Sequence, residues 1–114
     1  MLNASHCSAE LDLTAIPAME GAKSLLQEGY HSSLAPQNSL MASHIACDSA
    51  LIATADYCLL FDPQTAGGLL FGVAPELVEP CLDALNELGF ADAARIGEVI
   101  DPDSTGKPIR LLKS

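Results

Sequence analysis

A run of residues near the middle of the chain constrains the fold most, because it joins two apolar segments through a turn of fixed composition. It reads Leu60-Phe61-Asp62-Pro63-Gln64-Thr65-Ala66-Gly67-Gly68-Leu69-Leu70-Phe71. Pro63 holds the backbone φ near the value that a turn requires, and Asp62 can accept hydrogen bonds from the backbone ahead of it. Gly67 and Gly68 allow a positive φ or a close approach to another group. On residue types alone, the run predicts a tight connection between two strands.

The segments on either side of this turn predict buried strands. Residues 57–61 and 69–73 are continuous apolar runs, which are typical of strands covered on both faces. Two such strands need further layers above and below them, so we expect helices to pack on the sheet. The chain is therefore expected to combine helices and strands around one core.

Periodicity predicts further elements. Residues 9–16 alternate apolar and polar side chains, as a half-buried strand does. Residues 75–88 predict a helix, and Pro80 favours a start near Glu79 or a slight bend. The remaining expectations are a helix over 20–28, a loop over 32–38, weak helical periodicity over 40–45, and a hairpin of two strands over 94–100 and 108–112. Residues 50–55 fit either a helix or a strand, and both stay open.

Composition limits the size of the core and the kinds of partner. A chain of 114 residues suffices for one small domain, and 49% hydrophobic residues supply a core. Aromatic residues make up only 4%, so we expect a core of Leu, Ile, Val and Ala. The net charge is −10 with five basic residues, which argues against nucleic acid, anionic membranes and phosphate binding by this chain alone.

The sequence predicts a cytoplasmic protein. No stretch approaches the ~20 uninterrupted apolar residues of a transmembrane helix, and no secretory signal is present. No two of the four cysteines, Cys7, Cys47, Cys58 and Cys81, stand at CxxC spacing. A reducing cytoplasm is therefore the simplest compartment.

Residue types alone supply no catalytic or metal site. The glycine turn is not a P-loop, because no Lys-Ser or Lys-Thr follows it, and it lacks the GxGxxG pattern. His44 and Cys47 stand three residues apart, but two ligands are too few for a zinc site. Neither a Gly-x-Ser-x-Gly motif nor a supported Cys–His pair is present. We therefore expect no catalytic residue, no metal site and no cofactor in this chain alone.

The order of residues in the central turn resembles a family signature. Residues 62–70 resemble the Asp-Pro-Gln-Thr-Ser-Gly-Gly-Leu-Leu signature of selenide, water dikinase, or selenophosphate synthetase. Further resemblance to this family follows in the same order over residues 9–13, 16–17, 21–22, 32–38 and 95–99. The last of these also recurs across the aminoimidazole ribonucleotide synthetase-like superfamily. One departure is Ala66, where the signature usually has Ser, so any polar role of that hydroxyl is lost.

The resemblance implies a fold and an activity for the whole enzyme. Selenide, water dikinases make selenophosphate from selenide, ATP and water, releasing AMP and phosphate, and each subunit of the homodimer has an N-terminal and a C-terminal domain. The family's catalytic Cys (or selenocysteine), its Lys and its metal-binding aspartates lie upstream of the matched stretch, so none of the four cysteines inherits that role. Residues 1–114 are therefore expected to be a single domain, the later part of the C-terminal domain, with ATP and magnesium bound by the full-length enzyme. The implied fold is α/β (α+β), a mixed β-sheet with helices packed mainly on one face.

The resemblance also implies a site and partners. Thr65, Gly67 and Gly68 are expected to lie nearest the cleft with the N-terminal domain as substrate-binding residues, while Asp62 and Pro63 shape the turn. The expected partners are that N-terminal domain and further copies in a homo-oligomer.

Two alternatives to this interpretation stay open. One is a stand-alone, non-catalytic module derived from the domain, which self-associates through exposed apolar surface. The other is a different enzyme of the superfamily, such as a thiamine monophosphate kinase or a hydrogenase maturation factor. The order of residues 62–68 favours the selenide branch over this second alternative.

Overall fold

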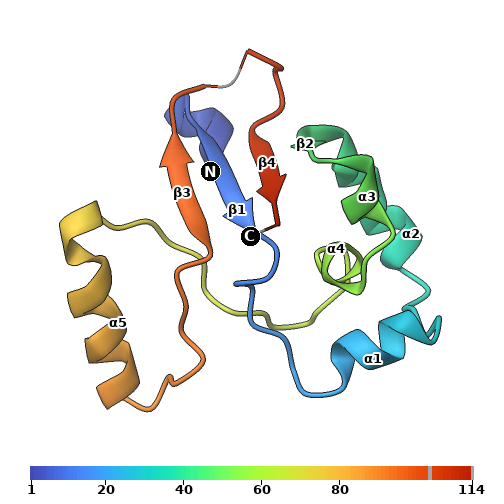
Figure 1. Ribbon diagram of the computed structural model, residues 1–114, viewed down its shortest axis with the longest axis horizontal. Helices are drawn as coiled ribbons and strands as arrows, with labels where there is room; N and C mark the ends of the chain where they lie inside the picture. The colour runs from blue at the N-terminus through green and yellow to red at the C-terminus, as the bar shows by residue number, and fades with distance from the viewer. Residues whose placement is uncertain (103, 114) are drawn as a thin grey trace.

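The computed structural model describes residues 1–102 and 104–113. Its elements follow one another as η1 (Leu2–Ser5), β1 (Ser8–Asp12), α1 (Ala22–Gln27), α2 (Ala35–Asn38), η2 (Ser39–His44), β2 (Ile45–Ala46), α3 (Ser49–Ile52), α4 (Ala55–Leu59), η3 (Pro75–Leu77), α5 (Val78–Glu87), β3 (Gly97–Ile100) and β4 (Ile109–Leu112). The strands form the centre, with α1 to α4 on one side and α5 on the other (Figure 1). Within the described residues, no helix has the length and apolar character needed to cross a bilayer.

The four strands form one mixed sheet in the order β2-β4-β1-β3. Strand β4 runs parallel to both β1 and β2, whereas β3 runs antiparallel to β1. The predicted mixed sheet is thus confirmed, but the predicted hairpin of the last two strands is wrong, because β1 lies between them. The turn residues after Ile100 show where the chain reverses. They do not show that the connection crosses over β1, a step of about 10 Å between next-nearest strands.

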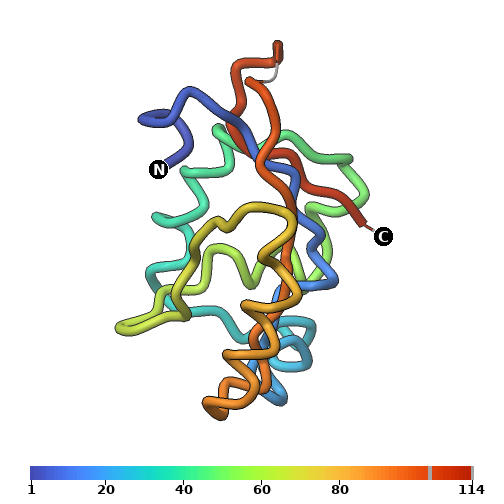
Figure 2. The backbone as a smooth tube through the Cα atoms, turned by 90° about the vertical axis from the view of Figure 1, so that its left-hand side faces the viewer, coloured from blue at the N-terminus to red at the C-terminus, as the bar shows by residue number. Residues whose placement is uncertain are grey.

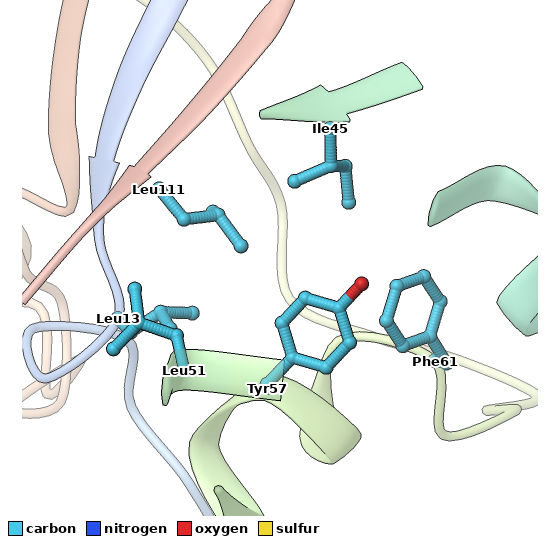
Figure 3. Packing of buried hydrophobic residues seen from close by; sticks show 6 residues of the cluster. All are labelled: Leu13, Ile45, Leu51, Tyr57, Phe61 and Leu111. Atoms are coloured by element: carbon cyan, nitrogen blue, oxygen red, sulfur yellow. The ribbon is translucent and has the colours of Figure 1, made fainter. Parts of the chain in front are cut away.

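The core lies between the sheet and helices α3 and α4. It consists of Leu13, Ile45, Leu51, Tyr57, Phe61 and Leu111, whose side chains converge in Figure 3. Helices therefore cover one face of the sheet, as expected. The expectation of a purely aliphatic core is wrong, because two of the few aromatic residues lie in it. Full burial of such side chains stabilises the fold by roughly 1.5–3 kcal/mol each.

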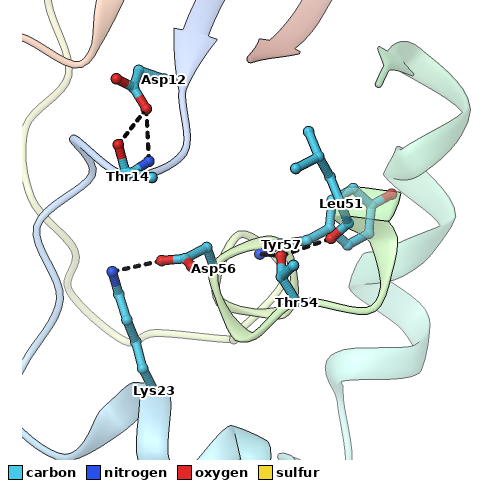
Figure 4. Close-up of polar contacts among 7 residues, drawn as sticks. All are labelled: Asp12, Thr14, Lys23, Leu51, Thr54, Asp56 and Tyr57. Carbon is cyan, nitrogen blue, oxygen red and sulfur yellow. Dashed lines mark hydrogen bonds and ion pairs between the residues drawn. The ribbon is translucent and has the colours of Figure 1, made fainter. Parts of the chain in front are cut away.

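The predicted strand over residues 57–61 is wrong, because this segment begins in helix α4 and ends in the turn that follows it. Thr54 caps α4 by accepting a hydrogen bond from the backbone N–H of Tyr57 at 3.2 Å (Figure 4). Tyr57 and Phe61 stand four residues apart, so the helical path brings both side chains to the core. A short apolar run of this kind has no period that distinguishes a buried strand from a buried helix. The neighbouring segment, 50–55, also resolves in favour of helix, with α3 capped by Asp48.

The predicted strand over residues 69–73 is also wrong. This segment has no regular structure and its apolar side chains are exposed. No described strand pairs with it, so its backbone gains none of the ladder hydrogen bonds that an extended run requires. The segment has the apolar composition of a strand, but no described strand lies beside it to form a ladder.

The predicted helix over residues 75–88 is confirmed with a short 3-10 turn, η3, before α5. The start of α5 at Val78 places Pro80 in the first turn, where its missing N–H donor has no intrahelical partner to lose. Helix α1 confirms the expectation for residues 20–28, and η2 confirms the helical periodicity over 40–45. The segment expected as a loop over 32–38 ends in the short helix α2.

Strand β1 is shorter than the alternating pattern over residues 9–16 suggests. It ends at Asp12, whose Oδ1 accepts hydrogen bonds from the backbone N–H and the hydroxyl of Thr14 at 2.8 and 2.7 Å (Figure 4). This turn redirects the chain, and Leu13 still enters the core with only 2% of its surface exposed. The alternation therefore predicted the inward residues correctly beyond the end of the strand.

Candidate functional site

The signature turn, residues 62–68, begins from a fixed point in the core. The backbone carbonyl of Phe61 accepts a hydrogen bond from Asn38 Nδ2 at 3.1 Å, and the N–H of Asp62 donates to the carbonyl of Leu59 at 3.2 Å. Asp62 and Pro63 are half-buried beside this anchor. The start of the turn is thus held by α4 and by the end of α2, while the rest of it leaves the body of the protein.

The predicted site residues lie on the exposed part of this turn. Thr65, Gly67 and Gly68 are all exposed, and the chain bends at Thr65 and Ala66. The stretch between α4 and α5 projects from the rest of the chain, as the yellow-green segment of Figure 2 shows. The three residues are therefore close together in sequence and share one exposed loop. Their expected role in substrate binding stays a prediction.

No steric constraint within the described residues explains why positions 67 and 68 are glycine. The glycines with φ in the left-handed region are Gly21, Gly29, Gly89 and Gly106. A Cβ on Gly68 would meet nothing within 4 Å, and a Cβ on Gly67 would meet only the flexible Gln64 side chain, with Oε1 at 3.3 Å. Of the two alternatives that the sequence left open, a positive φ is therefore not adopted at residues 67 and 68, and neither glycine lies against the backbone of another described residue.

An exposed apolar surface adjoins the signature turn. Leu69 is 88% exposed and Phe71 is 48% exposed, and Leu70 and Val73 are exposed as well. Sequence reasoning placed these residues in a buried strand and so missed the surface. The sequence contains no signal for this exposure, because an apolar run has the same composition whether its own chain or a partner covers it.

The titratable side chains of the described residues form no metal-binding cluster. Among residues 1–102 and 104–113, no three His, Cys, Asp or Glu side chains gather where a metal ion could bind. Burial, followed by charge on Cys47 and Cys58, raises the pKa of the Tyr57 phenol above its ordinary value. Lys23 forms an ion pair with Asp56 at 2.6 Å, which ties α1 to α4 (Figure 4). The ion pair stabilises the helical layer, and neither of its residues belongs to the signature turn.

A cavity of about 410 Å³ opens beside β2. Its lining includes Ile45, Cys47, Tyr57 and Lys107, and Lys107 Nζ donates a hydrogen bond to the carbonyl of Ile45 at 3.1 Å. None of the residues of the signature turn contributes to it. The structure therefore does not bring Thr65, Gly67 and Gly68 to this cavity.

Comparison with known proteins finds a matching family and several similar proteins. The family "AIR synthase related protein, C-terminal domain" matches residues 1–107. A selenide, water dikinase of Burkholderia pseudomallei is 36% identical over 95 residues, which cover 82% of this chain and 27% of the relative. A selenide, water dikinase of Pseudomonas straminea is 32% identical over 96 residues, covering 83% of this chain and 27% of the relative.

A shorter match of higher identity involves Pelobacter propionicus. Its selenide, water dikinase is 54% identical over 43 residues, which cover 38% of this chain and 12% of the relative. The chain thus spans about a quarter of the length of the first two relatives.

Proposed function

The chain belongs to the family of AIR synthase related protein C-terminal domains, and on that premise we propose that it is the C-terminal domain portion of a selenide, water dikinase-like enzyme. The observation that carries the proposal is the match over residues 1–107, together with relatives named selenide, water dikinase. The whole enzyme would make selenophosphate from selenide, ATP and water. Residues 1–114 would form one domain of it.

In this proposal the chain walls the catalytic cleft and performs no phosphoryl transfer itself. Transfer of a phosphoryl group needs bound metal and concentrated positive charge around the phosphates. The chain has a net charge of −10, and its described residues do not fit a metal ion. We therefore assign ATP and magnesium to the remaining, N-terminal portion of the enzyme.

The signature turn would face that portion. Thr65, Gly67 and Gly68 are exposed, and the two glycines meet no backbone of their own chain, so the lack of side chains there favours close approach by another part of the enzyme. Ala66 supplies no hydroxyl, so Thr65 is the side-chain hydroxyl available at the bend. Asp62 and Pro63, half-buried at the base, would shape the turn.

A second candidate function is a stand-alone, non-catalytic module that self-associates. The exposed side chains of Leu69, Leu70 and Phe71 favour it, because contiguous apolar surface marks interaction sites. In the preferred proposal the same surface is covered within the enzyme, which would itself be a homo-oligomer. The four free cysteines accord with a reducing cytoplasm, which we propose as the compartment.

The deciding experiment measures AMP formed from ATP with selenide and magnesium. The chain is assayed alone, then mixed with the N-terminal portion of the Pseudomonas straminea relative, which is also assayed alone and checked for folding by circular dichroism. We expect AMP only in the mixture. AMP formed by the chain alone would refute the assignment of catalysis to the other portion. If the N-terminal portion is folded and the mixture still forms no AMP, the self-associating module is favoured.

A further inference from the structure

Helix α5 has an apolar face that is not packed closely against the sheet or against α1 to α4. Val78, Cys81, Leu82 and Leu85 recur at three- and four-residue spacing and are all half-buried, while none of the helix is fully buried. The element that α5 chiefly contacts is η3, the turn that leads into it. In Figure 1 the helix stands to one side of the sheet, away from α1 to α4. A helix of ten residues with such a face is normally stabilised by packing against another element.

The segment before α5 exposes further apolar side chains. Residues 69–73 expose Leu69, Leu70, Phe71 and Val73, and Leu77 follows in η3. Phe90, just after α5, is exposed as well. Isolated exposed leucines are ordinary, but a contiguous apolar stretch is a mark of an interaction site.

Strand β3 offers an open sheet edge on the same side of the molecule. It is the last strand in the order β2-β4-β1-β3, and no described strand pairs with its outer edge. Figure 1 shows this edge facing the side on which α5 lies. Val99 of β3 is exposed. An uncovered edge presents backbone N–H and C=O groups that readily accept a further strand.

We propose that these features form one docking surface, which the remaining portion of the same enzyme covers with an extended apolar segment added to the outer edge of β3. We call it the α5 surface and define it as residues 69–73, the outer edge of β3, and Val78, Cys81, Leu82 and Leu85. The added strand bonds the β3 backbone, and its side chains contact the apolar residues of the α5 surface. This inference rests on the proposed function and names the partner's mode of contact.

The length of the relatives indicates this occupant. Because the chain spans about 27% of the two longer-matched relatives, most of such an enzyme lies outside the described structure and is available to cover the surface. The signature turn leads directly into residues 69–73, so a partner that contacts Thr65, Gly67 and Gly68 also reaches the α5 surface.

Charge argues against a second copy of this chain as the occupant. The face of α5 opposite the apolar residues is acidic and carries Glu79, Asp83 and Glu87, and Glu76 precedes it in η3. Each copy of the chain has a net charge of −10, so two copies joined through this surface would repel each other. The occupant is therefore expected to carry Lys or Arg around its apolar segment, which would make association faster at low salt.

The test compares the reactivity of Cys81 in two proteins. One is the 114-residue chain, and the other is the Pseudomonas straminea relative with its matched segment replaced by this chain. Iodoacetamide labelling followed by mass spectrometry gives the rate at each cysteine. We expect Cys81, on the α5 surface, to react at least about tenfold more slowly in the hybrid, because covered sites react only on opening. Cys47, which follows β2 at the opposite edge of the sheet, should react equally in both.

Two variants of the hybrid sharpen the test. Leu82→Glu places a charge on the α5 surface and should restore the reactivity of Cys81. Ala84→Glu adds the same charge to an exposed position of the same helix and should leave Cys81 protected. Equal Cys81 rates in the hybrid and the chain alone would overturn the proposal.

Sedimentation of the chain alone tests the occupant independently, even where the hybrid fails to fold. We expect a monomer. A dimer that protects Cys81 and is abolished by Leu82→Glu would assign the surface to a second copy and overturn the proposal.

AMP formation by the hybrid separates this inference from the proposed function. An active hybrid with reactive Cys81 refutes the docking surface alone, whereas an inactive hybrid with protected Cys81 refutes the activity alone.

Discussion

The ring of Tyr57 packs against the ring of Phe61, with centroids 5.1 Å apart and ring planes inclined by 59°. Tilted aromatic pairs at this distance stabilise a core by about 0.5–1.5 kcal/mol beyond the area that they bury. Phe61 directly precedes the signature turn, and Figure 3 shows both rings in the same cluster as Leu111 of the sheet. The signature turn therefore starts directly after a residue that is held in the core by this aromatic contact.

Replacing Phe61 by Ala should strongly destabilise the chain. The change leaves a cavity between α4 and the sheet and removes the ring contact, which together cost about 3–5 kcal/mol. Phe61→Leu keeps most of the volume and should cost less than half as much. Urea unfolding followed by circular dichroism measures both, and equal losses for the two variants would show that cavity size does not matter at this position.

Alkaline pH should destabilise the protein through Tyr57. Its pKa is raised in the folded state by burial and by charge on Cys47 and Cys58, whereas the unfolded phenol has a pKa of about 10. Below that value both states keep the proton and Tyr57 contributes no pH dependence. Above it the unfolded state loses the proton first, so the free energy of unfolding falls as the pH rises through the folded pKa.

The measurement for Tyr57 is urea unfolding between about pH 8 and pH 11, a window that brackets the unfolded pKa. Tyr57→Phe should flatten the alkaline fall in the free energy of unfolding. Tyr30→Phe, which alters the other, exposed tyrosine, is the matched control. An equally steep fall in Tyr57→Phe would contradict the assignment of this pH dependence to Tyr57.

The sequence predicted the elements with a clear period and missed those that depend on a distant partner. Helix α5 and strand β1 follow periods that the local sequence contains. Residues 57–61 are apolar throughout, so their own pattern does not decide between helix and strand, and the Thr54 cap and packing with Leu111 and Ile45 in the core favour the helix. The order of the sheet strands depends on which strands pair, and no local pattern encodes the crossing over β1.

The contrast between local pattern and distant partner also explains what could be predicted of the candidate site. The order of residues 62–70 indicated the family, and residue chemistry placed Asp62 and Pro63 at the base of the turn. The conformation of Gly67 and Gly68 was not predictable, because glycine permits many values of φ and the sequence does not choose among them. The exposure of residues 69–73 also escaped prediction, because an apolar run does not show whether a partner lies within its own chain.

Thr54 should stabilise the start of α4. Its Oγ1 accepts a hydrogen bond from the N–H of Tyr57 at 3.2 Å and donates one to the carbonyl of Leu51 at 2.6 Å. Thr54→Ala removes both and should lower the free energy of unfolding by about 1 kcal/mol. Thr54→Ser keeps the hydroxyl and should cost only a few tenths of that, as chemical denaturation can resolve. A serine variant as unstable as the alanine variant would show that the methyl group, not the cap, matters.

Gly97 should tolerate no side chain, because a Cβ there would collide with the backbone of β1. A Cβ at Gly97 would lie 2.0 Å from the backbone oxygen of Glu10 and 2.9 Å from Leu11 Cδ2. Gly97→Ala must therefore separate the two strands, and we expect a cost of about 3 kcal/mol or a failure to fold. Gly72→Ala, where a Cβ meets nothing within 4 Å, should leave the midpoint of thermal unfolding unchanged or slightly raised. Similar midpoints for both variants would be inconsistent with this strand contact.

Gly68 should matter for assembly and not for the stability of the chain. Its φ lies outside the left-handed region and a Cβ there meets nothing within 4 Å, so Gly68→Ala should unfold at the same urea concentration as the unaltered chain. If Gly68 lies against the N-terminal portion of the enzyme, the added methyl group should lower AMP formation by the mixture at least about tenfold, as misplacement near a reacting group does. Ala66→Ser adds one heavy atom to the same exposed bend but restores the residue that the family signature usually has, so its activity should not fall. Full activity in Gly68→Ala would place the partner elsewhere, since an unhindered turn has no reason to exclude a methyl group.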